Sequence, residues 1–377
     1  MSNEEIGIYV HIPFCKQRCY YCDFTSYCNK NNKIEPYIAA LKKEIQSQNI
    51  KPKINTIYIG GGTPSYIDSK YILEIINEIK KKNVLESAEI TIEVNPGTVT
   101  REKLEEYKNS GINRLSIGLQ TTSNKLLKQI GRIHNYEEFL ETYNIAREIG
   151  YDNINVDLIL GLPNQRIQDL KNSLDEVIKL TPEHVSVYSL IVEDGTPIKI
   201  QIENGNLQLP DEETERNMYW YVKNTLELNG YKHYEISNFA KEGYESKHNM
   251  NCWNQDEYIG FGVSAHSYRN ITRYSNTDNI NEYIRNIKNN SPERNRIIHE
   301  VQKLEDTEKE FMLLGLRKID GVSISDFKDR FGDNPIYLYR NELKKLSDEN
   351  LLKIDENYIR LTNKGIDLAN IVWEEFV

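Results

Sequence analysis

The chain has 377 residues and a formal net charge of −10, so it is long enough to bury a large core, while its acidic balance disfavours a general electrostatic grip on nucleic acid. Its first residues, MSNEEIGIYV, lack the basic start and apolar core of a signal peptide, and no apolar run reaches the length of a membrane span. We therefore expect a cytoplasmic protein that does not bind nucleic acid.

The first half of the sequence alternates short apolar runs with longer amphipathic stretches, which is the pattern of βα units. The expected strands are 7–12, 54–59, 88–94, 114–118, 155–160 and 184–190. The expected helices are 35–48, 69–82, 101–110, 136–149 and 168–180, several of them closed by Gly or Pro. Six repeats predict an α/β fold with a curled parallel sheet, a partial TIM-like (β/α)6 barrel, because they are too few to close an eight-stranded barrel.

The second half of the sequence is less regular. A Gly- and Asn-rich stretch at 203–209 precedes an expected helix at 211–229, and the following residues, to 268, are irregular and aromatic. Helical patterns near 306–317, 323–331 and 335–349 then lead to a hairpin, LLKIDENYIRL, and a last helix. This order is typical of a winged helix, here a packing or partner module rather than a DNA reader. The predicted division is a barrel over 1–200, a barrel extension and cap over 201–300, and a winged-helix-like domain over 301–377.

Three of the five cysteines lie within eight residues, in HIPFCKQRCYYCDF, where Cys15, Cys19 and Cys22 form C-x3-C-x2-C. Thiolates hold iron-sulfur clusters, and three of them leave one iron of a four-iron cubane without a protein ligand. S-adenosylmethionine can chelate that iron, and an electron from the cluster then breaks its C–S bond to give a 5'-deoxyadenosyl radical. The spacing therefore favours a [4Fe-4S] cluster with S-adenosylmethionine.

Two other readings of the cysteines remain open from the residues alone. A Cys3His zinc site that includes His11 is one, although zinc sites favour paired C-x2-C knuckles and no second pair is present. Three unliganded structural cysteines are the other, although free cysteines rarely crowd one loop.

The expected strand ends carry polar residues, and function collects at these ends in barrels of this kind. Three glycines, Gly60, Gly61 and Gly62 in GGGTP, allow close approach of a ligand to the backbone, or a plain turn. Glu93 in IEVNP suits ribose hydroxyls or an ammonium group, or a salt bridge. Asp157 lies in the apolar run NINVDLILGLP and needs a ligand or a structural hydrogen bond.

Two further polar residues follow the fourth strand. Gln120 ends the motif RLSIGLQ, and Arg132 stands in GRIH. An arginine there suits a ligand carboxylate, although a lone arginine is more often a solvated or capping residue.

Taken in order, YVHIPFCKQRCYYCDF, IGGGTPS, IEVNP, RLSIGLQ, GRIH, VDLILGLP and GLRKIDGVS resemble the radical-SAM family of oxygen-independent coproporphyrinogen III oxidases and, more closely, the related HemW heme chaperones. The resemblance covers nearly the whole chain. It implies cluster ligands at Cys15, Cys19 and Cys22 and S-adenosylmethionine contacts at Tyr9, Gly61 and Glu93. Where relatives bind a second such molecule, the resemblance implies contacts at Tyr21, Gly62, Thr63, Gln120, Arg132 and Asp157; whether this chain binds one or two stays open.

Three features favour the chaperones over the oxidases. The oxidases continue C-x3-C-x2-C-x-C where this chain has Phe24, and they carry an extension before the first strand. The stretch KHNMNCWNQDEYIGFG is similar to the chaperone signature HNxxYW, with His248, Asn249 and Trp253 matching and Cys252 in place of Tyr. The resemblance implies that His248 contacts heme; from the residues alone, a structural histidine is an equal alternative.

The remaining cysteine and histidines are expected to be structural. Cys28 reads as a free thiol. For His11, His134 and His266 a structural role is favoured, and an approach to heme or the cluster is the alternative.

The resemblance implies a heme chaperone that passes heme to hemoprotein acceptors, with an electron donor such as flavodoxin or ferredoxin and at most peripheral membrane contact. The alternative it implies is a coproporphyrinogen III oxidase of porphyrin biosynthesis. A third alternative is a radical enzyme with another substrate, because a fold does not fix its chemistry.

Overall fold

The fold is seen in a computed structural model that describes residues 4–377. Its main sheet has the strand order β12-β11-β10-β9-β1-β2-β3-β4-β5-β6-β8-β7. The central six strands pair in parallel and in chain order. They are β1 (Glu5–Ile12), β2 (Lys53–Gly61), β3 (Val84–Val94), β4 (Arg114–Gln120), β5 (Ile154–Leu160) and β6 (His184–Ser189). The predicted α/β partial barrel is confirmed.

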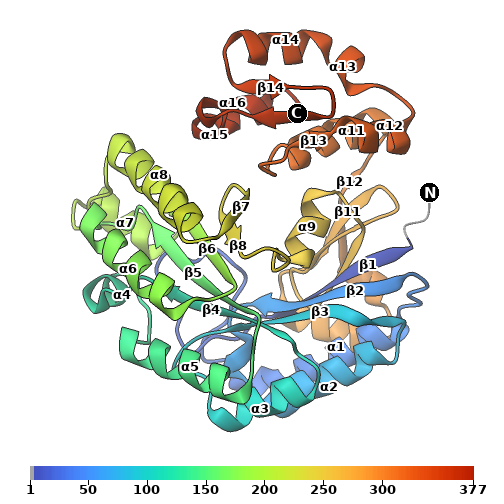
Figure 1. The fold of residues 1–377 in the computed structure, drawn as a ribbon. Coiled ribbons are helices and arrows are strands. Elements are labelled where there is room, and N and C mark those ends of the chain that lie inside the picture. Colours follow the sequence, from blue (N-terminus) through green and yellow to red (C-terminus); the bar gives the residue numbers. More distant parts are fainter. Residues whose placement is uncertain (1–3) are drawn as a thin grey trace.

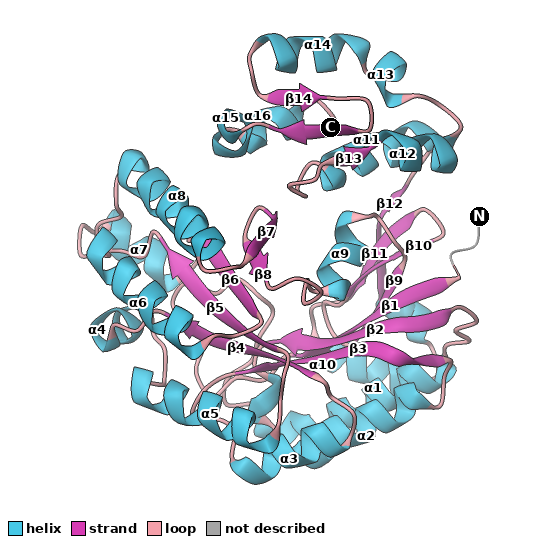
Figure 2. Ribbon diagram, in the orientation of Figure 1, coloured by secondary structure: helices cyan, strands magenta, loops and turns pink. Residues whose placement is uncertain are grey.

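Helices cover the outside of the curved sheet, as Figures 1 and 2 show. They are α1 (Ile34–Ser47), α2 (Ser69–Lys80), α3 (Arg101–Asn109), α4 (Asn124–Gln129), α5 (Tyr136–Ile149) and α6 (Ile167–Leu180). Each βα unit buries an apolar helix stripe against Ile, Leu and Val side chains of the strands. This packing leaves the concave side of the sheet free to form a site.

The segment between the six-stranded core and the last domain lengthens the sheet at both edges. Antiparallel β8 (Asn238–Ala240) and β7 (Lys232–Glu235) follow β6, while β9 (Tyr258–Phe261) pairs in parallel with β1. Beyond β9 lie the antiparallel strands β10 (His266–Arg269), β11 (Thr272–Asn276) and β12 (Arg296–Val301). The helices of this segment are α7 (Pro197–Glu203), α8 (Glu212–Leu228), α9 (Lys247–Trp253) and α10 (Ile280–Lys288).

The C-terminal residues form a second, smaller unit with its own three-stranded sheet, β13-β15-β14. Its elements are α11 (Leu304–Gly315), β13 (Val322–Ser323), α12 (Ile324–Phe331), α13 (Pro335–Leu338), α14 (Arg340–Asp348), β14 (Leu352–Ile354), β15 (Tyr358–Leu361), α15 (Asn363–Asp367) and α16 (Ala369–Glu374). The single helix expected at 335–349 is two, because Tyr339 leaves the helical conformation. The buried core of this unit shares no residue with the main core.

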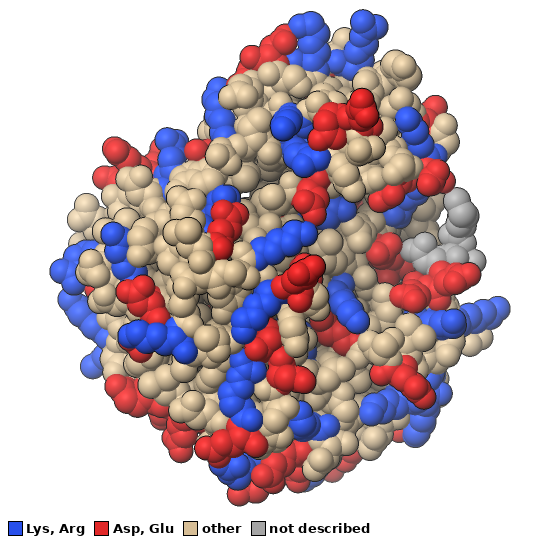
Figure 3. Space-filling view, in the orientation of Figure 1, with Lys and Arg blue, Asp and Glu red and all other residues tan. Residues whose placement is uncertain are grey.

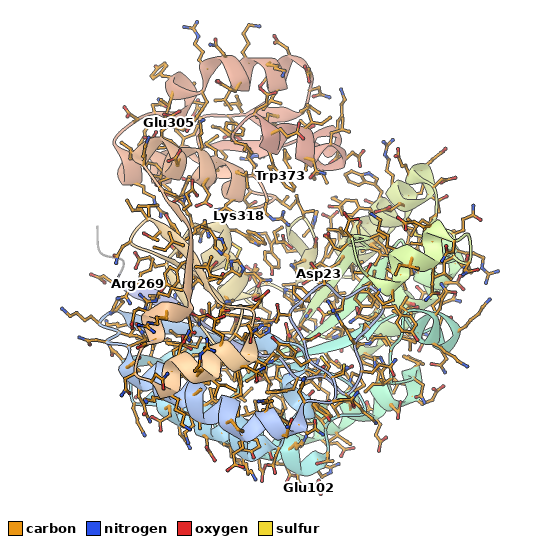
Figure 4. The ribbon with its side chains drawn as sticks, turned by 180° about the vertical axis from the view of Figure 1, so that it is seen from behind. Asp23, Glu102, Arg269, Glu305, Lys318 and Trp373 are labelled. Atoms are coloured by element: carbon orange, nitrogen blue, oxygen red, sulfur yellow. The ribbon has the colours of Figure 1, made fainter. Side chains whose placement is uncertain are left out.

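Arg317 joins this C-terminal unit to the rest of the chain. Its guanidinium lies 4.4 Å from the ring centroid of Trp253 in α9 and 5.0 Å from that of Trp373 in α16. Trp220 of α8 makes a second connection by donating its Nε1–H to Asp367 at 2.8 Å. Figure 4, seen from behind, places Trp373 between the C-terminal unit and the barrel.

Arg317→Ala is expected to lower the midpoint of thermal unfolding of the C-terminal unit. The change removes two stacked cation–aromatic contacts, worth together about 2 kcal/mol when partly desolvated. Circular dichroism during heating measures the midpoint. Arg340→Ala, at an exposed position with no described ion pair in residues 4–377, is the matched control and should leave the midpoint unchanged. Equal midpoints for both variants would contradict the coupling.

Within residues 4–377, none of the helices is both long and apolar enough to cross a bilayer.

Candidate functional site

A cavity of about 550 Å3 opens at the C-terminal ends of the parallel strands. Most of the predicted site residues line it: Cys15, Cys19, Tyr21, Cys22, Gly61, Gly62, Thr63, Glu93, Gln120, Arg132 and Asp157. They come from the loops after β1, β2 and β4 and from the strands themselves. Tyr9 and His248 lie outside this lining, and so do the three histidines expected to be structural.

The cysteine loop is fixed to its neighbours by hydrogen bonds. The backbone N–H of Cys15 donates to the Tyr27 carbonyl at 3.1 Å, and the Thr63 hydroxyl donates to the Cys15 sulfur at 3.4 Å. Arg132 donates from Nη1 to the Cys19 sulfur at 3.6 Å. Burial raises the pKa of the Cys15 thiol to about 11, so binding of a metal there releases a proton.

The residues present fit a cubane cluster. Among residues 4–377, no three His, Cys, Asp or Glu side chains converge as they would around one metal ion. Each thiolate of a cubane binds its own iron, so the three cysteines need only face one cavity. Gly62 makes room for them, because a Cβ there would lie 2.8 Å from the Cys15 sulfur and 3.1 Å from the Phe14 carbonyl oxygen.

Glu93 forms the next part of the wall. Tyr58 donates its hydroxyl to Glu93 Oε1 at 2.9 Å, and the N–H of Gly61 donates to Oε2 at 3.2 Å. Gly60 packs directly on this carboxyl, since a Cβ there would lie 3.0 Å from its atoms. Burial raises the pKa of Glu93 to about 7. The carboxyl is thus positioned to receive a cationic or hydroxyl-bearing ligand.

Binding of S-adenosylmethionine is expected to weaken as the pH falls below about 7. The raised pKa means that Glu93 is protonated below that value and carries its charge above it. Calorimetric titration of the cluster-loaded protein over this range measures the affinity. Glu93→Gln should bind weakly at every pH and lose this part of the pH dependence, while Glu86→Gln, on the exposed start of β3, should behave as the wild type. Equal pH profiles for wild type and Glu93→Gln would remove the ligand role of Glu93.

Another part of the wall is built around Arg132, a half-buried cation. Its Nη2 donates to Asn95 Oδ1 at 2.5 Å and to the Gly118 carbonyl at 2.7 Å. Gln120 ends β4 with a φ of 71°, a left-handed conformation that costs about 1 kcal/mol for a side chain of this kind. Such strain at the end of a strand turns the chain sharply at the cavity wall.

Asp157 lies in the interior of the barrel with polar neighbours. Its carboxylate accepts from Asn155 Nδ2 at 2.8 Å and from the Ser116 hydroxyl at 3.3 Å. Burial raises its pKa. Both the structural hydrogen bond expected as an alternative and access to the cavity are therefore present at this residue.

Two aromatic rings pack on Tyr58, a residue of the cavity lining. Tyr58 stacks on Tyr9 with ring centroids 6.3 Å apart and on His248 with ring centroids 5.2 Å apart. The Tyr9 hydroxyl bonds to His11 Nδ1 at 3.0 Å, while His11 Nε2 bonds to the Thr25 carbonyl at 2.9 Å. Tyr9 therefore supports the wall through its contact with Tyr58.

His248 is held in α9 against the inner face of the sheet and is 7% exposed. Its Nδ1 bonds to the Thr56 hydroxyl at 2.9 Å, and its backbone N–H donates to Glu89. Burial lowers the pKa of His248 to about 4, so the ring is neutral, and raises that of the nearby signature residue Cys252 to about 11. A heme contact at His248 stays a prediction.

Other cavity residues were not expected from the sequence. Tyr58, Asn95 and Ser116 line the cavity because inward-facing positions alternate along strands, so each lies two residues from a glycine or acid of the site. That alternation was the signal that could have found them. At the mouth, Phe24 is 65% exposed and Ile191 69%, and no pattern in the sequence indicated either.

A curled parallel sheet with three cysteines after its first strand, glycines after its second and an acid on its third defines a radical-SAM protein, and the model of the Radical SAM superfamily matches residues 9–177. The HemN C-terminal domain matches residues 303–368. The heme chaperone HemW of Bacillus subtilis is 40% identical and covers 98% of each chain, and that of Lactococcus lactis is 38% identical and covers 100% of this chain and 98% of its own. The chain belongs to the HemW family of heme chaperones.

The coproporphyrinogen III oxidase HemN of Escherichia coli, described as a radical SAM enzyme, has the same fold. The TM-score is 0.86 at 23% identity, over 99% of this chain and 90% of the oxidase. Membership of the radical-SAM class implies a [4Fe-4S] cluster and S-adenosylmethionine, which the three thiols and the cavity fit.

Proposed function

We propose that this chain is a heme chaperone that binds heme and passes it to hemoprotein acceptors in the cytoplasm. The observation that carries the proposal is the match to HemW chaperones along nearly the whole chain. The exposed Phe24, which stands at the mouth of the cavity in the position of the oxidases' further cysteine, agrees with it.

In this proposal different residues of the cavity bind the cluster and S-adenosylmethionine. Cys15, Cys19 and Cys22 hold the cluster, and Arg132 offsets the negative charge of thiolates and sulfides. Glu93, oriented by the Tyr58 hydroxyl, receives S-adenosylmethionine together with the glycines after β2. When bound, the cluster and S-adenosylmethionine supply one-electron chemistry.

The same proposal assigns the further cavity contacts and the heme contact. Gly62, Thr63, Tyr21, Gln120, Arg132 and Asp157 form the remaining ligand surface of the cavity. His248 is assigned to heme, which has to reach the ring from the side that Thr56 does not occupy.

Anaerobic reconstitution followed by heme titration tests the proposal. We expect a saturable Soret change in the wild type that is weakened in His248→Ala. His233→Ala is the matched control, because this buried histidine also has a lowered pKa but belongs to β7, where its ring contacts Tyr219 of α8, and lies outside the signature. Absence of saturable heme binding by a cluster-loaded sample would overturn the proposal.

The oxidase alternative is kept for one reason, the close fold likeness to HemN, which at 23% identity shows the fold alone. Incubation of the same sample with coproporphyrinogen III, S-adenosylmethionine and a reductant separates the two functions. Formation of protoporphyrinogen would support the oxidase, whereas heme transfer to an apo-hemoprotein without such turnover would support the chaperone.

A further inference from the structure

Helix α9, which carries the signature residue His248, lies on the concave side of the sheet (Figure 1) and packs on β2. On the surface seen in Figure 3 cations and acids are interspersed, whereas α9 meets β2 through uncharged side chains. Asn251 donates its Nδ2–H to Asn55 Oδ1 at 3.0 Å, and His248 Nδ1 bonds to the Thr56 hydroxyl at 2.9 Å. These two bonds fix the helix on the strand.

A second strand, β3, anchors the backbone of the same helix. The carboxylate of Glu89 accepts the backbone N–H of Lys247 at 3.2 Å and that of His248 at 3.2 Å. Gly7 of β1 leaves room for the imidazole, because a Cβ there would lie 3.0 Å from the Thr56 hydroxyl oxygen and 3.6 Å from Cε1 of His248. The imidazole is therefore held at its backbone and at Nδ1, and it offers a fixed surface to its neighbours.

The neighbour that joins this imidazole to the cavity is Tyr58. Thr56, Tyr58 and Gly60 share one face of β2, since side chains two residues apart along a strand point to the same side. His248 contacts the first two of them: besides its bond to the threonine, its ring stacks on that of Tyr58, with centroids 5.2 Å apart and 27° between the planes. Glu93 contacts the last two, because Tyr58 donates its hydroxyl to Oε1 at 2.9 Å and Gly60 packs on the carboxyl. Tyr58 thus contacts both the signature residue and the carboxyl of the cavity.

The hydroxyl of Tyr58 favours the charged form of Glu93. Burial raises the pKa of Glu93, the hydrogen bond from Tyr58 opposes this rise, and the nearby Asp157 of β5 adds to it. The other titratable groups that face this carboxyl are Tyr9 of β1 and Tyr188 of β6. Within residues 4–377, the Tyr58 hydroxyl is the one side-chain group that donates a hydrogen bond to Glu93. The position of the Tyr58 ring therefore sets both the orientation and the charge of the carboxyl.

We propose that His248 is a positioning residue for the S-adenosylmethionine site: its ring holds the ring of Tyr58, and Tyr58 in turn orients the Glu93 carboxyl. The inference rests on the binding of S-adenosylmethionine at Glu93 in the proposed function, and it gives His248 a role that does not depend on heme. His248 performs this role as a planar ring, whereas ligation of heme iron needs an imidazole nitrogen. A ring without a nitrogen at this position therefore separates the two roles.

Two substitutions of His248 test the inference. His248→Ala removes the ring that holds Tyr58, and His248→Phe keeps a ring without a nitrogen. We expect His248→Ala to weaken binding of S-adenosylmethionine to the heme-free, cluster-loaded protein about tenfold at neutral pH, and His248→Phe to bind as the wild type does. The pH midpoint of binding should also rise in His248→Ala, because Glu93 then lacks a well-placed hydroxyl that favours its charged form.

Tyr58→Phe tests the middle of this series of contacts. The change keeps the stacked ring and removes the hydroxyl, so it should raise the pH midpoint at least as far as His248→Ala does. Tyr58→Phe/His248→Ala should equal Tyr58→Phe alone, because His248 acts on Glu93 only through that hydroxyl.

The matched controls make the same chemical changes outside the cavity. Tyr231→Phe removes a buried hydroxyl that donates to the Pro182 carbonyl at 2.7 Å. His233→Ala removes a buried ring that stacks on Phe239 with centroids 4.5 Å apart. Neither residue lines the cavity, so both variants should bind S-adenosylmethionine as the wild type does.

Carbon-13 NMR of the glutamate carboxyls in cluster-free protein gives a readout that needs no ligand. The Glu93 signal is the one absent from Glu93→Gln, and its titration measures the pKa directly. We expect a pKa of about 7 in the wild type, in His248→Phe and in the controls, and a higher pKa in His248→Ala and Tyr58→Phe. Should His248→Ala fail to fold, His248→Leu, which fills the space without a planar ring, makes the same comparison.

Wild-type affinity and an unshifted Glu93 titration in His248→Ala would overturn the inference. So would equal losses in His248→Ala and His248→Phe, which would assign the effect to the imidazole nitrogens, or additive losses in the double variant. Heme titration of the same proteins keeps the two proposals apart. If the chaperone function is wrong, the wild type binds no heme; if only the inference is wrong, the wild type binds heme and S-adenosylmethionine, and the substitutions of His248 leave the binding of S-adenosylmethionine unchanged.

Discussion

Cys19→Ser and Cys22→Ser are each expected to lose most of the iron and sulfide that the wild type binds after anaerobic reconstitution. A serine hydroxyl is a poor ligand for iron compared with a thiolate, and a three-ligand site retains only two thiolates after either change. The half-buried position of both thiols means that the serines fit without repacking the fold. Iron and sulfide analysis, together with visible absorbance, measures the loss.

The remaining cysteines provide the matched control for this prediction. Cys28 lies just beyond the loop and does not line the cavity, and the thiol of Cys252 belongs to α9. Cys28→Ser and Cys252→Ser should therefore bind as much iron as the wild type. Loss of the cluster in Cys28→Ser but not in Cys252→Ser would show that Cys28 is a cluster ligand and that the predicted set of three cysteines is wrong.

Gly62→Ala is expected to lower the amount of bound iron nearly as much as loss of a cysteine does, although it removes no ligand. The added Cβ would approach the Cys15 sulfur to 2.8 Å and the carbonyl oxygen of Phe14 to 3.1 Å, and the second of these atoms is backbone. The loop can relieve this contact only by moving Cys15 away from β2, which separates it from the other two thiols. Reconstituted iron content should fall strongly while circular dichroism remains that of the wild type.

Gly97→Ala is the control for that change. Gly97 has a φ of +76°, so alanine there is strained by about 1 kcal/mol, but no atom lies within 3.7 Å of the added Cβ. This control carries more backbone strain than Gly62→Ala and makes no close contact. Equal iron contents in the two variants would show that the loop accommodates a methyl group beside Cys15.

The central barrel was predictable because the sequence patterns that indicate its strands and helices span many residues. Six apolar runs and five amphipathic stretches predict β1 to β6 and the helices α1, α2, α3, α5 and α6 to within a few residues, since each run spans enough positions for its period to show. The six-residue helix α4 was not expected. The polar residues at the strand ends were predictable as a group because parallel strands bring their C-terminal ends to one edge, where Gly62, Glu93 and Arg132 line one cavity.

The edges of the sheet were not predictable. The strands β7 to β12 have three to six residues each, too few for alternation to be distinguished from an irregular aromatic stretch. The burial of His248 could not be read from its sequence either. It depends on Thr56 and Glu89, which lie more than 150 residues away along the chain, and such long-range contacts leave no local pattern.

The junction held by Arg317 places all three tryptophans of the chain at one boundary. Trp220 and Trp253 approach it from α8 and α9, and Trp373 from the C-terminal unit. The tryptophan fluorescence of the protein therefore reports whether the C-terminal unit is packed against the barrel. A red shift of the emission with an unchanged far-ultraviolet circular dichroism spectrum would show that this unit separates from the barrel before either hydrophobic core unfolds.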